Sequence, residues 1–166
     1  MSTSNAPSAA EPAKGEAGDS LAHRKRWMAV LARSATADLE SQWQALHPDV
    51  GYQMLRAPES GMAMVRARIG GNGGQFNLGE MTVTRCSVCL DNGTIGHAYV
   101  AGRDRRRAEL AAAFDALLQD PSRRPEIIRK VIEPLAAKRA SARGRRSRKA
   151  AATKVDFFTL IRGEDT

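Results

Sequence analysis

The feature that most constrains the fold is a long stretch, 51–101, in which apolar and polar residues alternate with a period of two. Such alternation is typical of β-strands, whose successive side chains point to opposite faces of a sheet. It predicts an antiparallel sheet of about four strands joined by two hairpins, with strands at 51–57, 61–69, 80–90 and 94–101. We place the hairpin turns at Pro58-Glu59-Ser60 and at Asp91-Asn92-Gly93, where Asn-Gly tolerates positive φ.

The second predicted strand has two faces of different chemistry. One face, which we expect to point into the core, carries Ala63, Val65, Ala67 and Ile69. The other face carries Met62, Met64, Arg66 and Arg68. Because Met and Arg are enriched at protein–protein interfaces, we interpret these four residues as candidates for a subunit interface; a partly solvated surface is the alternative.

Helical patterns flank the strands. A first helix is expected over 20–34, and a second begins near Thr36, a plausible N-cap, and ends before Pro48. After the strands, Leu110, Phe114, Leu117 and Leu118 recur at helical spacing and predict a helix over 104–119. A short helix before Pro134 follows. The fold class is therefore α+β, with two N-terminal helices and a helix packed after the last strand.

The positive charge is concentrated in one part of the chain. The net charge is +8, and residues 103–149 hold 15 Lys and Arg against 6 Asp and Glu, whereas the remainder holds 11 against 12. Such a local surplus indicates an anionic partner. Within it, the cluster Arg103, Arg105, Arg106 and Arg107 opposes the dipole of the predicted helix, and these arginines are candidates for contact with an anion, with solvated arginines as an equal alternative.

Four segments complete the predicted organisation. Residues 1–19 are expected to be a disordered tail and 20–137 the α+β core domain. Residues 138–154 form a basic connector, in which 138–149 carry seven positive charges and no acid; we expect it to be helical only if a partner screens the repulsion. Residues 155–166 are a C-terminal docking arm, because apolar residues gather there beyond the connector: Phe157, Phe158, Leu160 and Ile161.

The motifs for catalysis and metal binding are weak. Cys86 and Cys89 form a lone C-x-x-C, and residues i and i+3 of a strand point to opposite faces, so buried, inert thiols are favoured over a metal site. The glycine-rich loop 70–74 lacks the lysine of a phosphate-binding loop and is interpreted as a connection between strands. No nucleophile and base stand at a productive spacing.

The expected location is the cytoplasm, because the sequence shows no signal peptide and no apolar run long enough to span a membrane.

A nucleic-acid-binding regulator is the alternative from the residues alone. Two helices followed by a hairpin are similar to a winged helix, and KRASARGRRSRK is similar to a phosphate-binding arm. Against this, the second helix contains two acids and no Lys or Arg. A helix of that charge is poorly suited to the major groove.

Four segments in order carry a family resemblance: RKRWMAVLARS, RAPESGMAMVRARIGGNGGQFNLGEMTVTRCSV, GTIGHAYVAGRDRRRAELAAAFDALLQ and KVDFFTLIRG. Together they resemble the G subunit (PhnG) of the bacterial carbon–phosphorus lyase core complex over about residues 24–163. The long tail before residue 20 and the arginine-dense connector depart from the family pattern. The ordered series, from the arginine–tryptophan helix to the terminal VDFFT-RG, is what makes the resemblance specific.

The resemblance implies a non-catalytic or accessory subunit in organic phosphonate catabolism. Its implied partners are the I, H and J subunits, with the K and L subunits associating. With the I, H and L subunits it would support formation of α-D-ribose 1-alkylphosphonate 5-triphosphate and adenine from MgATP and an alkylphosphonate. The implied cofactors, an iron–sulfur cluster and S-adenosylmethionine, belong to the J subunit, and none is expected on this chain. The family offers no catalytic residue to carry over.

Overall fold

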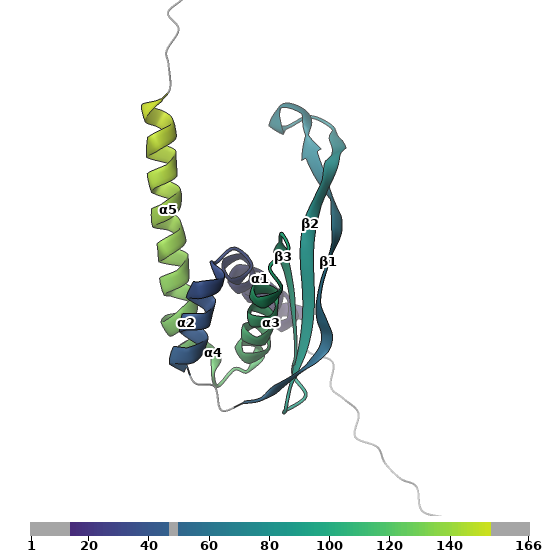
Figure 1. Cartoon of the computed structure of the whole chain (residues 1–166), viewed down its shortest axis with the longest axis vertical. Helices are drawn as coiled ribbons and strands as arrows, with labels where there is room; N and C mark the ends of the chain where they lie inside the picture. The colour runs from purple at the N-terminus through teal and green to yellow at the C-terminus, as the bar shows by residue number, and fades with distance from the viewer. Residues whose placement is uncertain (1–13, 47–49, 154–166) are drawn as a thin grey trace, which may run out of the picture.

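A computed structural model describes residues 14–46 and 50–153 and has one antiparallel sheet in the order β1-β2-β3 (Figure 1). The strands are β1 (Tyr52–Arg68), β2 (Gln75–Leu90) and β3 (Ile95–Ala101). Helices α1 (Lys14–Leu31) and α2 (Thr36–Leu46) precede the sheet, and α3 (Arg105–Gln119), α4 (Arg124–Ile127), the π-helical turn η2 (Ile128–Ile132) and α5 (Glu133–Ala152) follow it. The predicted α+β class is confirmed, and α1 begins earlier than expected.

The prediction of four strands is wrong, because the two strands predicted at 51–57 and 61–69 are one continuous strand, β1. The expected turn at Pro58 is instead an irregularity, where the pairing with β2 shifts register between Arg56 and Glu59. Proline cannot donate to the sheet but is tolerated at a bulge in an edge strand, and β1 is such an edge. Glu59 stabilises the irregularity by accepting from Arg56 and Arg85, each at 2.6 Å.

The true end of the β1–β2 hairpin lies in the glycine-rich loop predicted to connect strands. The 3-10 turn η1 (Ile69–Gly71) begins it, and Gly70 and Gly71 adopt φ of 58° and 89°. These values suit glycine because L side chains rarely adopt positive φ. The second hairpin lies where expected: Gly93 has φ 84°, and the pairing places Ser87 opposite His97.

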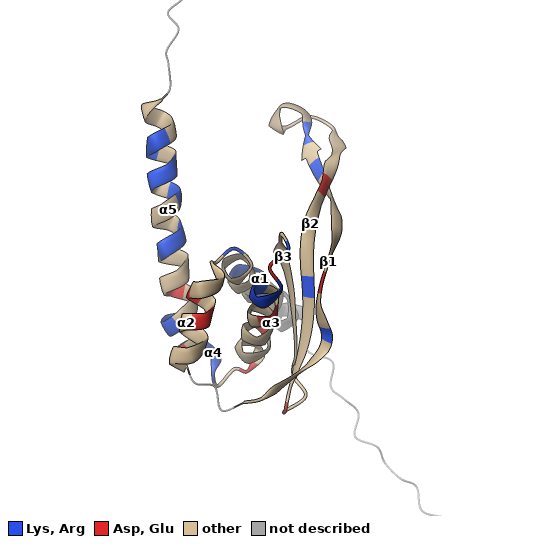
Figure 2. Ribbon diagram, in the orientation of Figure 1, with Lys and Arg blue, Asp and Glu red and all other residues tan. Residues whose placement is uncertain are grey.

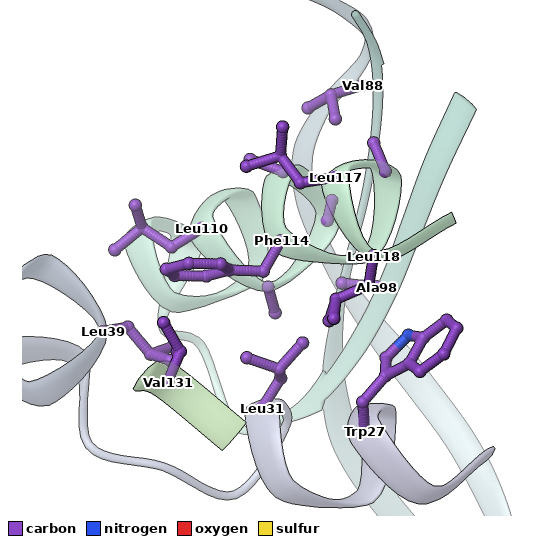
Figure 3. Packing of buried hydrophobic residues seen from close by; sticks show 14 of the residues in the cluster. Trp27, Leu31, Leu39, Val88, Ala98, Leu110, Phe114, Leu117, Leu118 and Val131 are labelled. Carbon is purple, nitrogen blue, oxygen red and sulfur yellow. The ribbon is translucent and has the colours of Figure 1, made fainter. Parts of the chain in front are cut away.

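The core is built around α3, which lies on one face of the sheet (Figure 3). Every residue from Leu110 to Leu118 is buried, including Phe114 at the centre between the sheet and the other helices. The covering strand residues are the alternate ones expected from a period of two: Cys86, Val88, Leu90, Ala98 and Val100. A helix that is buried on all sides needs layers on both flanks, which the sheet and α1, α2 and η2 supply.

Gly96 is required by the close approach of β3 to α3. A Cβ atom on Gly96 would lie 2.0 Å from the carbonyl oxygen of Ala112 and 2.7 Å from the amide nitrogen of Ala116. Both atoms belong to the helix backbone, so a side chain at this position would push the layers apart. The short distance explains why a strand otherwise rich in larger residues contains glycine here.

Asp115 is a fully buried carboxylate on α3 that joins three elements. Its Oδ1 accepts hydrogen bonds from Arg24 Nε (3.0 Å) and Trp27 Nε1 (2.9 Å) of α1. Its Oδ2 accepts from Arg24 Nη2 (2.5 Å) and from the backbone amide of His97 in β3 (3.0 Å). A buried charge is tolerated only when it is paired and hydrogen-bonded, and here both oxygens are satisfied.

The expectation for the outer half of β1 needs correction. The face of β1 predicted to be core is not part of it: Ala63, Val65 and Ala67 are half-buried, and Ile69 is 68% exposed. The basic connector 138–149 is helical throughout as part of α5. Within the described ranges, no helix is long and apolar enough to cross a membrane.

We predict that Asp115→Asn lowers the free energy of unfolding by about 3 kcal/mol, because the amide loses the charge-assisted bonds and turns an NH₂ group toward donors. Chemical denaturation followed by circular dichroism measures this. Asp120→Asn is the control, since Asp120 lies in a turn and Asn can still accept from Ser122. A variant at position 115 as stable as this control would contradict the role of the buried carboxylate.

Gly96→Ala should destabilise the protein by about 1–3 kcal/mol through overpacking against the α3 backbone. Gly61→Ala is the matched control, because nothing lies within 4 Å of a Cβ atom there. The midpoint of thermal unfolding of each variant is the readout. Equal midpoints for the two alanine variants would show that the layers separate without cost.

Candidate functional site

The distal part of the β1–β2 hairpin extends beyond the rest of the sheet (Figure 1). The last pair between β2 and β3 is Val83 with Ala101, so residues 61–82 form a two-stranded ribbon, which we call the hairpin arm. Several large apolar side chains of this arm are at least 40% exposed: Met62, Met64, Ile69, Phe76, Leu78 and Met81. No core residue within the described ranges lies in the hairpin arm. Two-stranded ribbons are marginally stable alone, and exposed apolar patches mark interaction sites.

Four of the predicted interface residues lie on one face of this arm. Met62 and Met64 are 71% and 53% exposed, and Arg66 and Arg68 are exposed next to them. The face is the continuation of the helix-covered face of the sheet, because Ser60, in the same alternation, hydrogen-bonds at 2.9 Å to the buried Thr84. The other predicted interface residues, Phe157, Phe158, Leu160 and Ile161, lie outside the described residues.

The four arginines predicted to contact an anion do not act as one cluster. Arg106 is engaged by Glu109 (3.0 Å) and Glu40 (3.3 Å). Arg107 donates to the carbonyl of Ala101 and lies 4.0 Å from Asp104. Arg103 and Arg105 are exposed, and neither forms an ion pair within residues 14–46 and 50–153. Two of the four arginines, Arg106 and Arg107, thus have acidic partners, whereas Arg103 and Arg105 have none among the described residues.

Asp104 explains why a helix can begin with three arginines. Its side chain accepts from the amide of Arg107 at 2.9 Å and so caps the N-terminus of α3. Thr36 is the first residue of α2 and donates to the Asp104 carboxylate, so it links α2 to α3 instead of capping its own helix as predicted. Burial would raise the pKa of Asp104, but these hydrogen bonds and Arg107 lower it overall.

The second extended feature is α5, which stands away from the body in the same direction as the hairpin arm (Figure 1). At its base Leu135 is buried, Lys138 pairs with Asp38 of α2 (2.6 Å), and Arg139 donates to the carbonyl of Ala29 (3.0 Å). From 140 to 153 every residue except Gly144 is exposed. Figure 2 shows Lys and Arg along this part of the helix and acidic residues only near its base.

The two cysteines lie on opposite faces of β2, as predicted. Cys86 is buried in the core, where burial raises the pKa of its thiol to about 11, whereas Cys89 is half-buried on the other face. A thiol held protonated in this way is a poor nucleophile. No group of three or more potential metal ligands occurs among the residues that the structure describes.

Sequence reasoning missed one polar contact, between Ser87 Oγ and His97 Nδ1 at 2.8 Å. The signal was available, because the turn predicted at Asn92-Gly93 fixes the register that pairs these residues. They lie on the sheet face opposite α3, with His97 exposed and Ser87 half-buried, and make a cross-strand polar pair.

A hollow of about 210 Å³ lies between the β2–β3 turn and the end of α3. It is lined by Val50, Leu90, Asp91, Asn92, Leu117, Asp120 and Arg123.

Comparison with known proteins identifies the family of this chain. The family model described as "Phosphonate metabolism protein PhnG" matches residues 22–163. The subunit PhnG of alpha-D-ribose 1-methylphosphonate 5-triphosphate synthase from Rhizobium meliloti (strain 1021) is 43% identical over 145 residues, which cover 87% of this chain and 92% of that protein. The family match spans both arms as well as the body. The chain therefore belongs to the PhnG family of phosphonate metabolism proteins.

Proposed function

We propose that this chain is the PhnG subunit of alpha-D-ribose 1-methylphosphonate 5-triphosphate synthase, and that its task is to assemble the complex. The name of the Rhizobium meliloti relative supports the identity of the complex. The observation that carries the assembly role is the hairpin arm, whose exposed methionines, leucine and phenylalanine contribute nothing to the core of the free chain. A partner surface that covers them would gain about 25 cal/mol for each Å² of apolar area buried.

The proposal extends to partners and cofactors. The chain would contact chiefly the I subunit, within a complex that also contains the H and J subunits and to which K and L associate. MgATP and the alkylphosphonate would be substrates of the complex. The iron–sulfur cluster and S-adenosylmethionine would reside on the J subunit. This chain would hold no cofactor and supply no catalytic residue.

The alternative role as a winged-helix regulator receives less support. The apolar side of α2 packs on the body through Leu39, and its acidic residues Asp38 and Glu40 are engaged beside it by Lys138 and Arg106. A recognition helix needs that surface free for a groove. The apolar hairpin arm would also be an unusual wing, because phosphate contacts call for Lys and Arg rather than Met and Phe.

We predict that Met62→Ser/Met64→Ser reduces co-purification with a tagged I subunit about tenfold when all subunits are co-expressed, equivalent to about 1.4 kcal/mol. Leu21→Ser is the matched control, since Leu21 is 54% exposed on α1. Release of adenine from MgATP and methylphosphonate should fall in proportion to the complex recovered. Normal assembly of the methionine variant would refute the role of the hairpin arm.

Removal of residues 155–166 should also release the chain from the I subunit, because the apolar segment 155–163 is proposed to dock there. Removal of residues 1–13 is the control and should leave assembly unchanged. The amount of each truncated chain that elutes with the tagged subunit in size-exclusion chromatography is compared. Equal recovery of both truncated chains would exclude docking by the C-terminal segment.

A further inference from the structure

Two arms extend from the body in the same direction (Figure 1). One is the hairpin arm, and the other is α5 beyond its last packed turn, residues 140–152, which we call the helical arm. The hairpin arm rises about 23 Å from Gly61 to Arg68, and the helical arm about 18 Å from Ala140 to Ala152. The arms are therefore similar in reach, and a single partner can touch both.

The inner side of the helical arm is defined by the packing at its base. Ile132 and Leu135 are buried against the body, and Arg139 reaches the carbonyl of Ala29. Continuing this face with helical spacing places Arg143 and Arg146 on it, directed over the body toward the hairpin arm. Arg145 and Arg148 lie on the outer side of the same helix, and Arg145 bonds to Ser141 (2.9 Å).

The inner side of the hairpin arm follows from the sheet. Met62, Met64, Arg66 and Arg68 continue the strand face that α3 covers nearer the body, because they share the alternation of Ser60. Their partners on β2 include one acid, Glu80, opposite Met64. This wall is thus cationic at its tip and apolar nearer the body.

The body between the arms adds further positive charge. Because Val83 pairs with Ala101, the segment that follows β3 lies where the hairpin arm leaves the body. That segment contains Arg103 and Arg105, which are exposed and form no ion pair among the described residues. Arg106 is balanced by Glu40 and Glu109, so it adds little to the field. Arginines of the helical arm, the hairpin arm and the body therefore lie at the same end of the molecule.

We propose that the two arms clasp an acidic, partly apolar surface of a partner subunit, such as an acidic amphipathic helix; this rests on the proposed function, which supplies the partner. Charge complementarity selects an acidic occupant, since opposite potentials steer association and fix register. The methionines select protein over nucleic acid, because they are adaptable apolar contacts with nothing to offer a phosphate. The helical arm is already helical and exposed in the free chain, which limits the entropy lost on docking.

The test compares two double variants with the same change of charge on opposite sides of the helical arm: Arg143→Glu/Arg146→Glu inside and Arg145→Glu/Arg148→Glu outside. Each is co-expressed with the other synthase subunits, and its recovery with tagged complex is measured at several NaCl concentrations. All four side chains are exposed and outside the core, so circular dichroism should show the same helix content for both variants. We expect recovery of the inner variant to fall about tenfold or more, and of the outer variant less than about twofold.

Equal effects of the two variants, or none from either, would overturn the clasp. Binding of a 20-base-pair RNA or DNA duplex by the wild-type chain, weakened equally by both variants at about 150 mM salt, would assign the helical arm to nucleic acid and also overturn it. These outcomes are distinct from failure of the proposed function, in which the wild-type chain itself does not join the complex. An assembled wild-type complex with equal losses in both variants refutes the clasp alone.

Discussion

The buried carboxylate of Asp115 holds the body of the protein together. It lies on the central helix α3 and accepts from α1 and from the backbone of β3, elements that are far apart in the sequence. Apolar contacts between these layers are not directional, whereas this set of charge-assisted bonds fixes which residues face each other. The position of Trp27, and with it the cation–π contact from Arg124 (5.7 Å to the ring centroid), depends on that arrangement.

A body fixed in this way can support arms that have no core of their own. The buried apolar residues of the described chain lie between Trp27 and Leu135, and none of them belongs to residues 61–82 or 140–152. α5 is anchored through η2, where Val131 and Ile132 are buried, and through the Lys138–Asp38 pair. The hairpin arm is anchored through the lower half of β1 and β2, which α3 covers. The directions of both arms are therefore set by the same packed layers.

Local patterns predicted the body well because each element there obeys its own periodicity. The apolar spacing of Leu110, Phe114 and Leu117 marked α3, and Asn92-Gly93 marked the second hairpin. The failures concern tertiary context. Pro58 is interpreted as a turn residue because the sequence does not show that β1 is an edge strand. In an edge strand, a register shift accommodates the proline. Alternation in 62–69 identified a strand but could not show that neither face reaches the core.

Both arms have features that destabilise the free chain and that a protein acting alone would not need. Seven cations without an acid in 138–149 repel one another along α5, and the exposed methionines of the hairpin arm order water around apolar surface. The charge and the apolar surface lie on facing sides of two arms of similar reach. An acidic partner with an apolar face would offset both costs at once, because burial of the methionines lowers the local dielectric in which the arginines act. The same residues that destabilise the free chain thus favour its assembled form.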